Sequence, residues 1–200
     1  MNTETTATNS QEHLMDSGEN EVLSPEKEFS NLFERMYEIC INNNWGDPFS
    51  YARSREIHMS NALHHKVAET FSGADAIDQD GNEVEYKSTT GKKINATYNG
   101  ISVQPTWDDQ VKYLTEKKIG RYKHHYFTRY ENGKIQETWR MDANDVLNLA
   151  LTKLKPIYES EKKRKDPRLG FNITHKYIYK NATQIYNREN ESLTNSITLS

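Results

Sequence analysis

The amino-acid sequence predicts one α/β (α+β) domain, in which helices flank a mixed central β-sheet. Amphipathic stretches with helix-capping residues alternate with short strand-like runs, and this alternation favours a mixed domain. Asp80-Gly81 and Asn132-Gly133 each separate two strand-like runs, and such dipeptides favour tight hairpin turns. The length of 200 residues suits a single hydrophobic core.

The two ends of the chain differ in composition from its middle. Residues 1–28 hold seven acidic residues and one lysine, a net charge of −6, so the remainder of a chain of net charge −3 carries +3. We interpret residues 1–24 as an acidic disordered tail, 25–186 as the folded domain and 187–200 as a polar C-terminal tail. The acidity of the whole chain therefore hides a mildly basic body.

Two classes of protein are not expected from this composition. The sequence has no run of about 18 apolar residues and no charged-then-apolar leader, so we expect no membrane span, no signal peptide and a cytoplasmic location. The single cysteine, Cys40, can form neither an internal disulfide nor a thiolate zinc cluster. We expect it to pack as a small hydrophobic side chain.

The first helix is predicted over residues 25–42. Ser24 is a good N-cap and Pro25 suits the first helical position. Apolar side chains then recur at three- and four-residue steps and form a stripe suited to core or dimer packing: Phe29, Leu32, Phe33, Met36, Ile39 and Cys40. A weaker helical pattern covers residues 52–68.

Strands are expected from Gly73 onward. Residues 74–78 and 83–90 form a predicted hairpin, and residues 91–105 contain a third strand with irregular connections. A Thr-x-x-Asp cap then begins a helix over residues 107–119, which ends at a glycine.

The C-terminal half continues with a second hairpin, formed by residues 122–130 and 134–141. Asp142 and Asp145 cap a following helix that we expect to be interrupted near Pro156. The final pattern predicts a strand pair at residues 174–179 and 183–186. Residues 152–168 carry a local charge of +4, with seven basic and three acidic residues, which suits either ordinary solvated surface or phosphate binding.

The first hairpin carries the most informative residues. Strand alternation places Glu85 and Lys87 on one face and Tyr86 on the other, and the hairpin brings Asp75 beside that pair. Carboxylate oxygens suit Mg²⁺, so Asp75 and Glu85 are candidate metal ligands. Lys87 would position or help deprotonate an attacking water and offset charge at phosphorus. The alternative is an exposed Glu/Lys strand face with Asp75 in a turn.

This stretch resembles the PD-(D/E)XK nuclease superfamily, in which an acid on one strand precedes acid-x-Lys on the next. It is most similar to PvuII-type restriction endonucleases, through Gly73-x-Asp75-Ala76, the turn Asp80-Gly81-Asn82 and Glu85-x-Lys87-Ser88 in the same order and spacing. The similarity covers roughly residues 50–186 and is looser toward its ends. Ala74 stands where the motif name has Pro.

The resemblance implies a restriction-endonuclease-like fold and a type II restriction endonuclease of a restriction-modification system. Such an enzyme is a homodimer that uses Mg²⁺ to cleave double-stranded DNA at a specific sequence, leaving 5′-phosphate and 3′-hydroxyl ends. Glu56 corresponds to an acid on the preceding helix and would be a further catalytic residue at the metal. An ordinary surface salt bridge is the alternative role for Glu56.

The DNA-reading residues depart from the PvuII-type pattern, because no histidine run follows the catalytic lysine. Amide side chains stand there instead, and amides can bond bidentately to adenine in the major groove. The candidate DNA contacts are Asn95, Asn99, Gln104, Lys92, Lys93 and Arg53. Basic strips at residues 112–123 and 152–168 are candidate phosphate contacts.

Several features keep other interpretations open. The pairs His64-His65 and His124-His125 lack a companion acid or cysteine at ligand spacing, so a structural or DNA-contact role is expected. Tyr113 is expected to pack in the core. Two alternative functions remain: a structure-selective repair or recombination nuclease, and a catalytically inactive DNA-binding module of the same fold.

Overall fold

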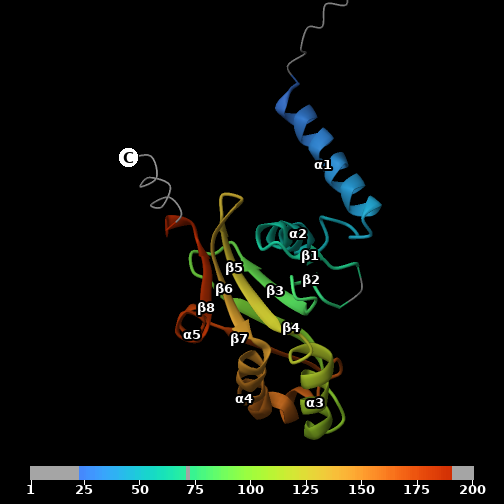
Figure 1. Cartoon of the computed structure of the whole chain (residues 1–200). Helices are drawn as coiled ribbons and strands as arrows, with labels where there is room; N and C mark the ends of the chain where they lie inside the picture. The colour runs from blue at the N-terminus through green and yellow to red at the C-terminus, as the bar shows by residue number, and fades with distance from the viewer. Residues whose placement is uncertain (1–22, 71–72, 191–200) are drawn as a thin grey trace, which may run out of the picture. The chain divides into compact units, whose positions relative to one another are not determined.

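The computed structural model describes residues 23–70 and 73–190 (Figure 1). The chain divides into two parts between Arg35 and Met36. No helix among the described residues is both long enough and apolar enough to cross a membrane.

Helix α1 (Pro25–Asn42) begins and ends where the sequence predicts. The Ser24 hydroxyl accepts a hydrogen bond from the Lys27 amide at 3.3 Å, and the Ser24 carbonyl accepts one from the Glu28 amide at 2.9 Å. Along the predicted apolar stripe, Phe29 is 69% exposed and Leu32 is 57% exposed. Cys40 is buried, as expected.

The second part of the chain, from Met36 onward, contains a mixed six-stranded sheet, which confirms the predicted fold class. Its strand order is β1 (Lys66–Val67), β2 (Ala76–Ile77), β3 (Glu83–Thr89), β5 (His124–Glu131), β6 (Lys134–Asp142) and β8 (Thr183–Asn187). Strands β3 and β5 are parallel, and the other neighbours are antiparallel. A separate antiparallel pair is formed by β4 (Ala96–Ser102) and β7 (Arg168–Ile173).

Helices cover both faces of the six-stranded sheet (Figure 1). Met59 of α2 (Arg53–Ala62) packs with Val84 and Tyr86 on one face. On the other face, α4 (Ala143–Glu161) and the β4–β7 pair enclose the larger core around Phe127. Glu85 and Lys87 project on this second face, because their register partners in β5 are His125 and Phe127.

The structure corrects the predicted end of the second helix. Helix α2 ends at Ala62, and residues 66–67 form β1 instead of a last helical turn. His64 has a φ of 55°, a left-handed conformation that reverses the chain after the helix. Pairing of Val67 with Ala76 buries Val67 in the sheet, which outweighs the weak helical pattern of this stretch.

The C-terminal prediction was wrong in one element and incomplete in another. Residues 175–181 form the short helix α5 (His175–Asn181), not a strand, while β8 is at the predicted place. Tyr177 and Ile178 are adjacent yet both pack against the larger core, which a helix allows and a strand does not. Strand β7 (Arg168–Ile173) was not predicted, because its first residue belongs to the charged segment 152–168, which was interpreted as surface.

Helix α4 also differs from its prediction, since it continues through Pro156 without interruption. Leu154 and Tyr158 lie on either side of the proline and are 0% and 2% exposed, so core packing holds the helix across it. Asp142 occupies the N-cap position but makes no capping hydrogen bond with its side chain. Its carboxylate instead lies 3.0 Å from Nε2 of His124.

The helix predicted over residues 107–119 is present in two parts. Helix α3 (Trp107–Tyr113) begins with the predicted cap, in which the Thr106 hydroxyl accepts a hydrogen bond from the Asp109 amide at 3.1 Å. The chain then widens into the π-helix η1 (Leu114–Lys118). Its Ile119 amide donates to the Leu114 carbonyl, five residues back, at 2.8 Å. Sequence periodicity does not distinguish this wider turn from an α-helix.

Candidate active site

The hairpin of β2 and β3 brings Asp75 to the strand that carries Glu85 and Lys87. Asp78 closes its turn, where Asp78 Oδ1 accepts hydrogen bonds from the amides of Asp80 and Asn82 at 3.0 and 2.8 Å. Asp75 Oδ2 accepts a hydrogen bond from the Tyr86 amide at 2.7 Å. This bond fixes the Asp75 carboxylate beside β3.

Glu85 and Lys87 lie on one face of β3, as strand alternation predicts. The Lys87 ammonium donates to Oε1 of Glu85 and lies 3.2 Å from the Tyr86 carbonyl. The Tyr86 ring points to the opposite face, where its hydroxyl lies 2.7 Å from Nδ1 of His65. The side chains of Glu85 and Lys87 are 16% and 24% exposed, so both are accessible to a ligand.

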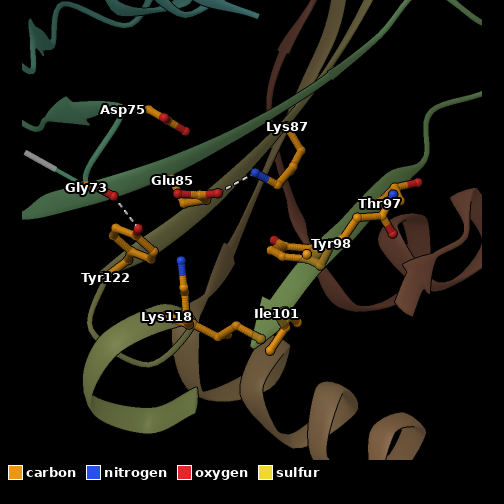
Figure 2. A pocket seen from close by; sticks show the side chains of 12 residues that line it. Gly73, Asp75, Glu85, Lys87, Thr97, Tyr98, Ile101, Lys118 and Tyr122 are labelled. Atoms are coloured by element: carbon orange, nitrogen blue, oxygen red, sulfur yellow. Dashed lines mark hydrogen bonds and ion pairs between the residues drawn. The ribbon is translucent and has the colours of Figure 1, made fainter. Parts of the chain in front are cut away.

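Asp75, Glu85 and Lys87 line a single pocket of about 370 Å³ (Figure 2). The remaining lining comes from the loop before β2, from β4 and from the end of η1: Gly73, Thr97, Tyr98, Asn99, Gly100, Ile101, Lys118, Ile119 and Tyr122. In Figure 2 the Glu85 carboxylate lies between Asp75, Lys87 and Lys118. The pocket is therefore lined by two acids and two lysines.

Electrostatics within this pocket favour a bound cation. Burial, together with the charges of Glu85 and Glu56, raises the pKa of Asp75 to about 8. Burial opposes the charge of Lys87, but the neighbouring carboxylates of Glu85 and Asp75 outweigh it and raise the Lys87 pKa. Without a cation, Asp75 is thus held protonated at neutral pH, while Lys87 remains an ammonium group.

The donor set fits Mg²⁺. Asp75 and Glu85 both line the pocket, and the bonds from the Tyr86 amide and from Lys87 engage one oxygen of each carboxylate. Mg²⁺ is usually bound by one or two carboxylates, with water and phosphate oxygens completing its octahedron. Within residues 23–70 and 73–190, no group of three or more His, Cys, Asp and Glu side chains is placed to hold a metal.

A buried histidine connects two walls of the pocket. His125 is 0% exposed; its Nε2 lies 3.0 Å from the Ile119 carbonyl and its Nδ1 lies 2.8 Å from the Tyr98 hydroxyl. Because a carbonyl only accepts, Nε2 carries the proton and Nδ1 accepts from Tyr98. Burial lowers the pKa of His125 to about 4, so it stays neutral. The Lys87 ammonium lies over the Tyr98 ring, 5.1 Å from its centroid.

Glu56 lies near this centre but not in the same pocket. It lines an adjoining hollow that it shares with Asp75, and its charge contributes to the raised pKa of Asp75. An ion pair joins it to Arg53 at 3.3 Å. Glu56 therefore acts on Asp75 electrostatically in this structure, and its predicted catalytic role stays a prediction.

The residues predicted to contact DNA do not all lie at the pocket. Asn99 lines the pocket, and Asn95, Lys92 and Lys93 are exposed near the start of β4. Gln104 lies outside this pocket. Its backbone amide donates a hydrogen bond to Oε1 of Gln110 at 2.9 Å, and Gln104 lines a separate hollow.

The Arg53 guanidinium is engaged in hydrogen bonds within the protein. Its Nε donates to the Trp45 carbonyl at 2.7 Å, and its other nitrogens bond to the Ala68 carbonyl and to Glu56. The bonds to Trp45 and Ala68 join α2 to the segments before and after it, so a role in DNA binding would require these bonds to be exchanged.

The histidine pairs and Tyr113 have mainly structural contacts. His125 is fully buried, which excludes the DNA contact that was one of its expected roles, and His65 is bonded to Tyr86. His124 is paired with Asp142, and Tyr113 packs against the larger core as expected. His64 is exposed at the reversal after α2.

Sequence reasoning included Lys118 only as one member of the basic strip at residues 112–123, and it did not predict a site role for Tyr122 or the pairing of Tyr98 with His125. The strip does not single out Lys118, because a 3.6-residue period does not reveal the π-turn that directs this side chain to the pocket. Tyr122 donates its hydroxyl proton to the Gly73 carbonyl and so closes the pocket beside Asp75. In the sequence, the alternation of Ala96 and Tyr98 with the polar residues Thr97 and Asn99 is a signal that Tyr98 faces the core, and the structure buries both Ala96 and Tyr98.

No family model matches the chain, and no curated protein matches it. The similarity to PD-(D/E)XK nucleases therefore rests on the motif around Asp75, Glu85 and Lys87. The chemistry of this pocket has to follow from the residues that line it.

Proposed function

We propose that this protein is a type II restriction endonuclease that acts on double-stranded DNA in the cytoplasm and requires Mg²⁺. The observation that carries the proposal is the convergence of Asp75, Glu85 and Lys87 in one solvent-accessible pocket. Asp75 directly precedes β2, and Glu85 and Lys87 lie on the neighbouring strand β3, in the order of the nuclease motif. A chance Glu-x-Lys on an exposed strand face would need neither the buried aspartate nor its raised pKa.

Each residue has a distinct role in the proposed reaction. Asp75 and Glu85 would hold Mg²⁺, which polarises the scissile phosphate and lowers the pKa of a nearby water. Lys87 keeps its proton beside the two carboxylates, so its contribution is positive charge that offsets the charge developing at phosphorus. Tyr98 lies beneath the Lys87 ammonium and restricts where it can move.

The reaction is hydrolysis of one phosphodiester bond on each strand. The oxygen of a water molecule forms a bond to phosphorus while the bond from phosphorus to the 3′ oxygen breaks. The water loses one proton to solvent and the departing 3′ oxygen gains one, which leaves a 5′-phosphate and a 3′-hydroxyl. One active site per chain then calls for a second copy to cut the second strand.

The exposed face of α1 supports a homodimer. Phe29 and Leu32 are 69% and 57% exposed on a helix whose apolar stripe runs from Phe29 to Cys40. Large apolar side chains gathered on one helix face mark an interaction surface more often than solvent-facing surface. A two-fold dimer through this face would match a palindromic DNA site.

The direct test is digestion of a mapped plasmid with the purified protein and Mg²⁺, followed by sequencing of the ends. We expect discrete fragments with 5′-phosphate ends and no cutting in EDTA. Cutting only at branched or damaged DNA would instead support a structure-selective repair or recombination nuclease. DNA binding without cutting in the presence of any divalent cation would instead support a catalytically inactive DNA-binding module.

Lys87→Ala separates the catalytic role from folding and binding. We expect the variant to bind the duplex like the wild type but to cleave it at least about 100-fold more slowly, since it lacks a cation at the reacting phosphate. Lys134→Ala, at the exposed first position of β6, is the matched control and should cleave normally. A Lys87→Ala variant as active as the wild type would remove Lys87 from the mechanism.

A further inference from the structure

The pocket contains a second lysine that the nuclease motif does not include. Lys118 lies at the end of η1 and lines the pocket across from β3. In Figure 2 its side chain extends toward Glu85 and Tyr122, on the opposite side of Glu85 from Asp75. An anion bound at the two carboxylates through a cation would therefore meet ammonium groups on two sides.

Lys118 differs from the other cations near the pocket in its bonding. The Lys87 ammonium is engaged by Glu85, and the Arg121 guanidinium is engaged by Glu83, with 3.0 Å between Nε and the carboxylate. The Lys118 ammonium makes no hydrogen bond or ion pair to any residue in the described part of the chain. Its three donors are thus available to a ligand.

The backbone that carries Lys118 is firmly held. Leu114 and Ile119, at the two ends of η1, are 0% and 2% exposed, and the buried His125 donates to the Ile119 carbonyl. Gly120 follows immediately, and a Cβ there would lie 2.6 Å from the Thr115 carbonyl oxygen, so only glycine permits this close turn. Such π-turns recur at functional sites, where the extra residue redirects a side chain.

We propose that Lys118 is a phosphate-binding residue of the active site, whose ammonium group contacts the phosphodiester that enters the pocket. The proposal rests on the nuclease function proposed above and adds a substrate contact on the wall opposite β3. Lys87 offsets charge from the strand side while paired with Glu85, and Lys118 supplies the unpaired charge that attracts the phosphate. Electrostatic contacts of this kind raise affinity for any DNA sequence.

The first test measures DNA binding, so it does not depend on cleavage. A fluorescein-labelled duplex is titrated with wild type and variants in Ca²⁺ at several salt concentrations. We expect Lys118→Ala to bind less tightly and to reduce the slope of log affinity against log salt by about 0.9, the value for one phosphate contact. Lys118→Arg, which keeps the charge, should restore the slope.

Lys134→Ala is again the control, because Lys134 is an exposed lysine at the start of β6, outside this pocket and outside both basic strips. It should leave the single-turnover cleavage rate in Mg²⁺ unchanged, whereas Lys118→Ala should lower that rate about 100-fold, as for a lost donor at a transition-state charge. A salt slope for Lys118→Ala equal to that of the wild type would overturn the proposal. If the slope changes but the wild type never cleaves DNA, the nuclease function fails and the phosphate contact stands.

Discussion

At the scale of single residues, the surroundings of Asp75 strongly oppose its negative charge. The fold places its carboxylate in a partly buried position near two other acids, Glu85 and Glu56, and Lys87 and one backbone amide compensate it in part. A carboxylate in such a place costs stability unless it is protonated or bound to a cation. The unfavourable environment is what makes this site suited to a divalent metal.

The cost should be visible as a pH dependence of stability in EDTA. The pKa of Asp75 is about 8 in the folded protein, above its ordinary value of 3.8, so the folded state holds an extra proton between these values. The free energy of unfolding should therefore fall as pH rises from about 5 to 8, by at most about 1.4 kcal/mol per pH unit from this group.

Asp75→Asn isolates that contribution, because the amide oxygen can still accept from Tyr86 but does not titrate. We expect the melting temperature of the wild type to fall relative to the variant across this pH range. Mg²⁺ should recover the difference at pH 8 for the wild type alone. Parallel melting curves for the two proteins at every pH would contradict the assignment of Asp75 as a buried, cation-dependent acid.

At the scale of elements, sequence patterns predicted those structures whose signals are local. Ser24-Pro25 marked the start of α1, and Asp80-Gly81 and Asn132-Gly133 marked the two hairpins, since caps and tight turns depend on neighbouring residues. The Glu85–Lys87 face followed from strand alternation alone. These local signals were enough to predict that Asp75 lies beside the strand that carries Glu85 and Lys87.

The elements that were missed depend on contacts between distant segments. Residues 174–179 were predicted as a strand, but Ile178 is buried by the core that α4 and β7 complete, and the segment forms α5. The π-turn at η1 depends on Gly120 and on a hydrogen bond from His125, which no local period reports. The same holds for the candidate site: the motif residues were predicted individually, whereas Lys118 was predicted only as one member of the basic strip at residues 112–123.

Helix α1 gives a prediction about assembly at this scale. Phe29→Lys combined with Leu32→Lys puts two charges on its apolar stripe, and we expect the protein to become monomeric, since an interface core does not tolerate unpaired charges. Sedimentation analysis measures the mass. A monomer should also nick plasmid DNA before linearising it, because the second strand must await a second encounter.

The control for this variant is Asn31→Lys combined with Glu34→Gln. It adds the same two units of positive charge to the opposite side of the helix, so it should keep the mass and the cleavage pattern of the wild type. If both double variants have the mass of the wild type, the stripe on α1 is not the dimer interface.

At the scale of the whole molecule, the distribution of charge matters more than its sum. The net charge is −3, yet the residues after position 28 carry +3, and Lys118 and the strip over residues 152–168 belong to that basic body. Phosphate binding depends on such local basic regions. If the chain binds DNA as proposed, we expect the acidic N-terminal residues to slow its association with DNA through long-range repulsion.

Neutralising those acids in the full-length chain tests this balance. Changing Glu4, Glu12, Asp16, Glu19 and Glu21 to the corresponding amides raises the net charge from −3 to +2 without removing any residue. At low ionic strength we expect the variant to associate with duplex DNA faster than the wild type, because repulsion between like charges slows encounter. At about 1 M salt the Debye length falls to about 3 Å, and the two rates should converge. Stopped-flow measurements with a labelled duplex give both rates; a difference that persists at high salt would mean that these residues block the DNA surface directly and do not act through charge.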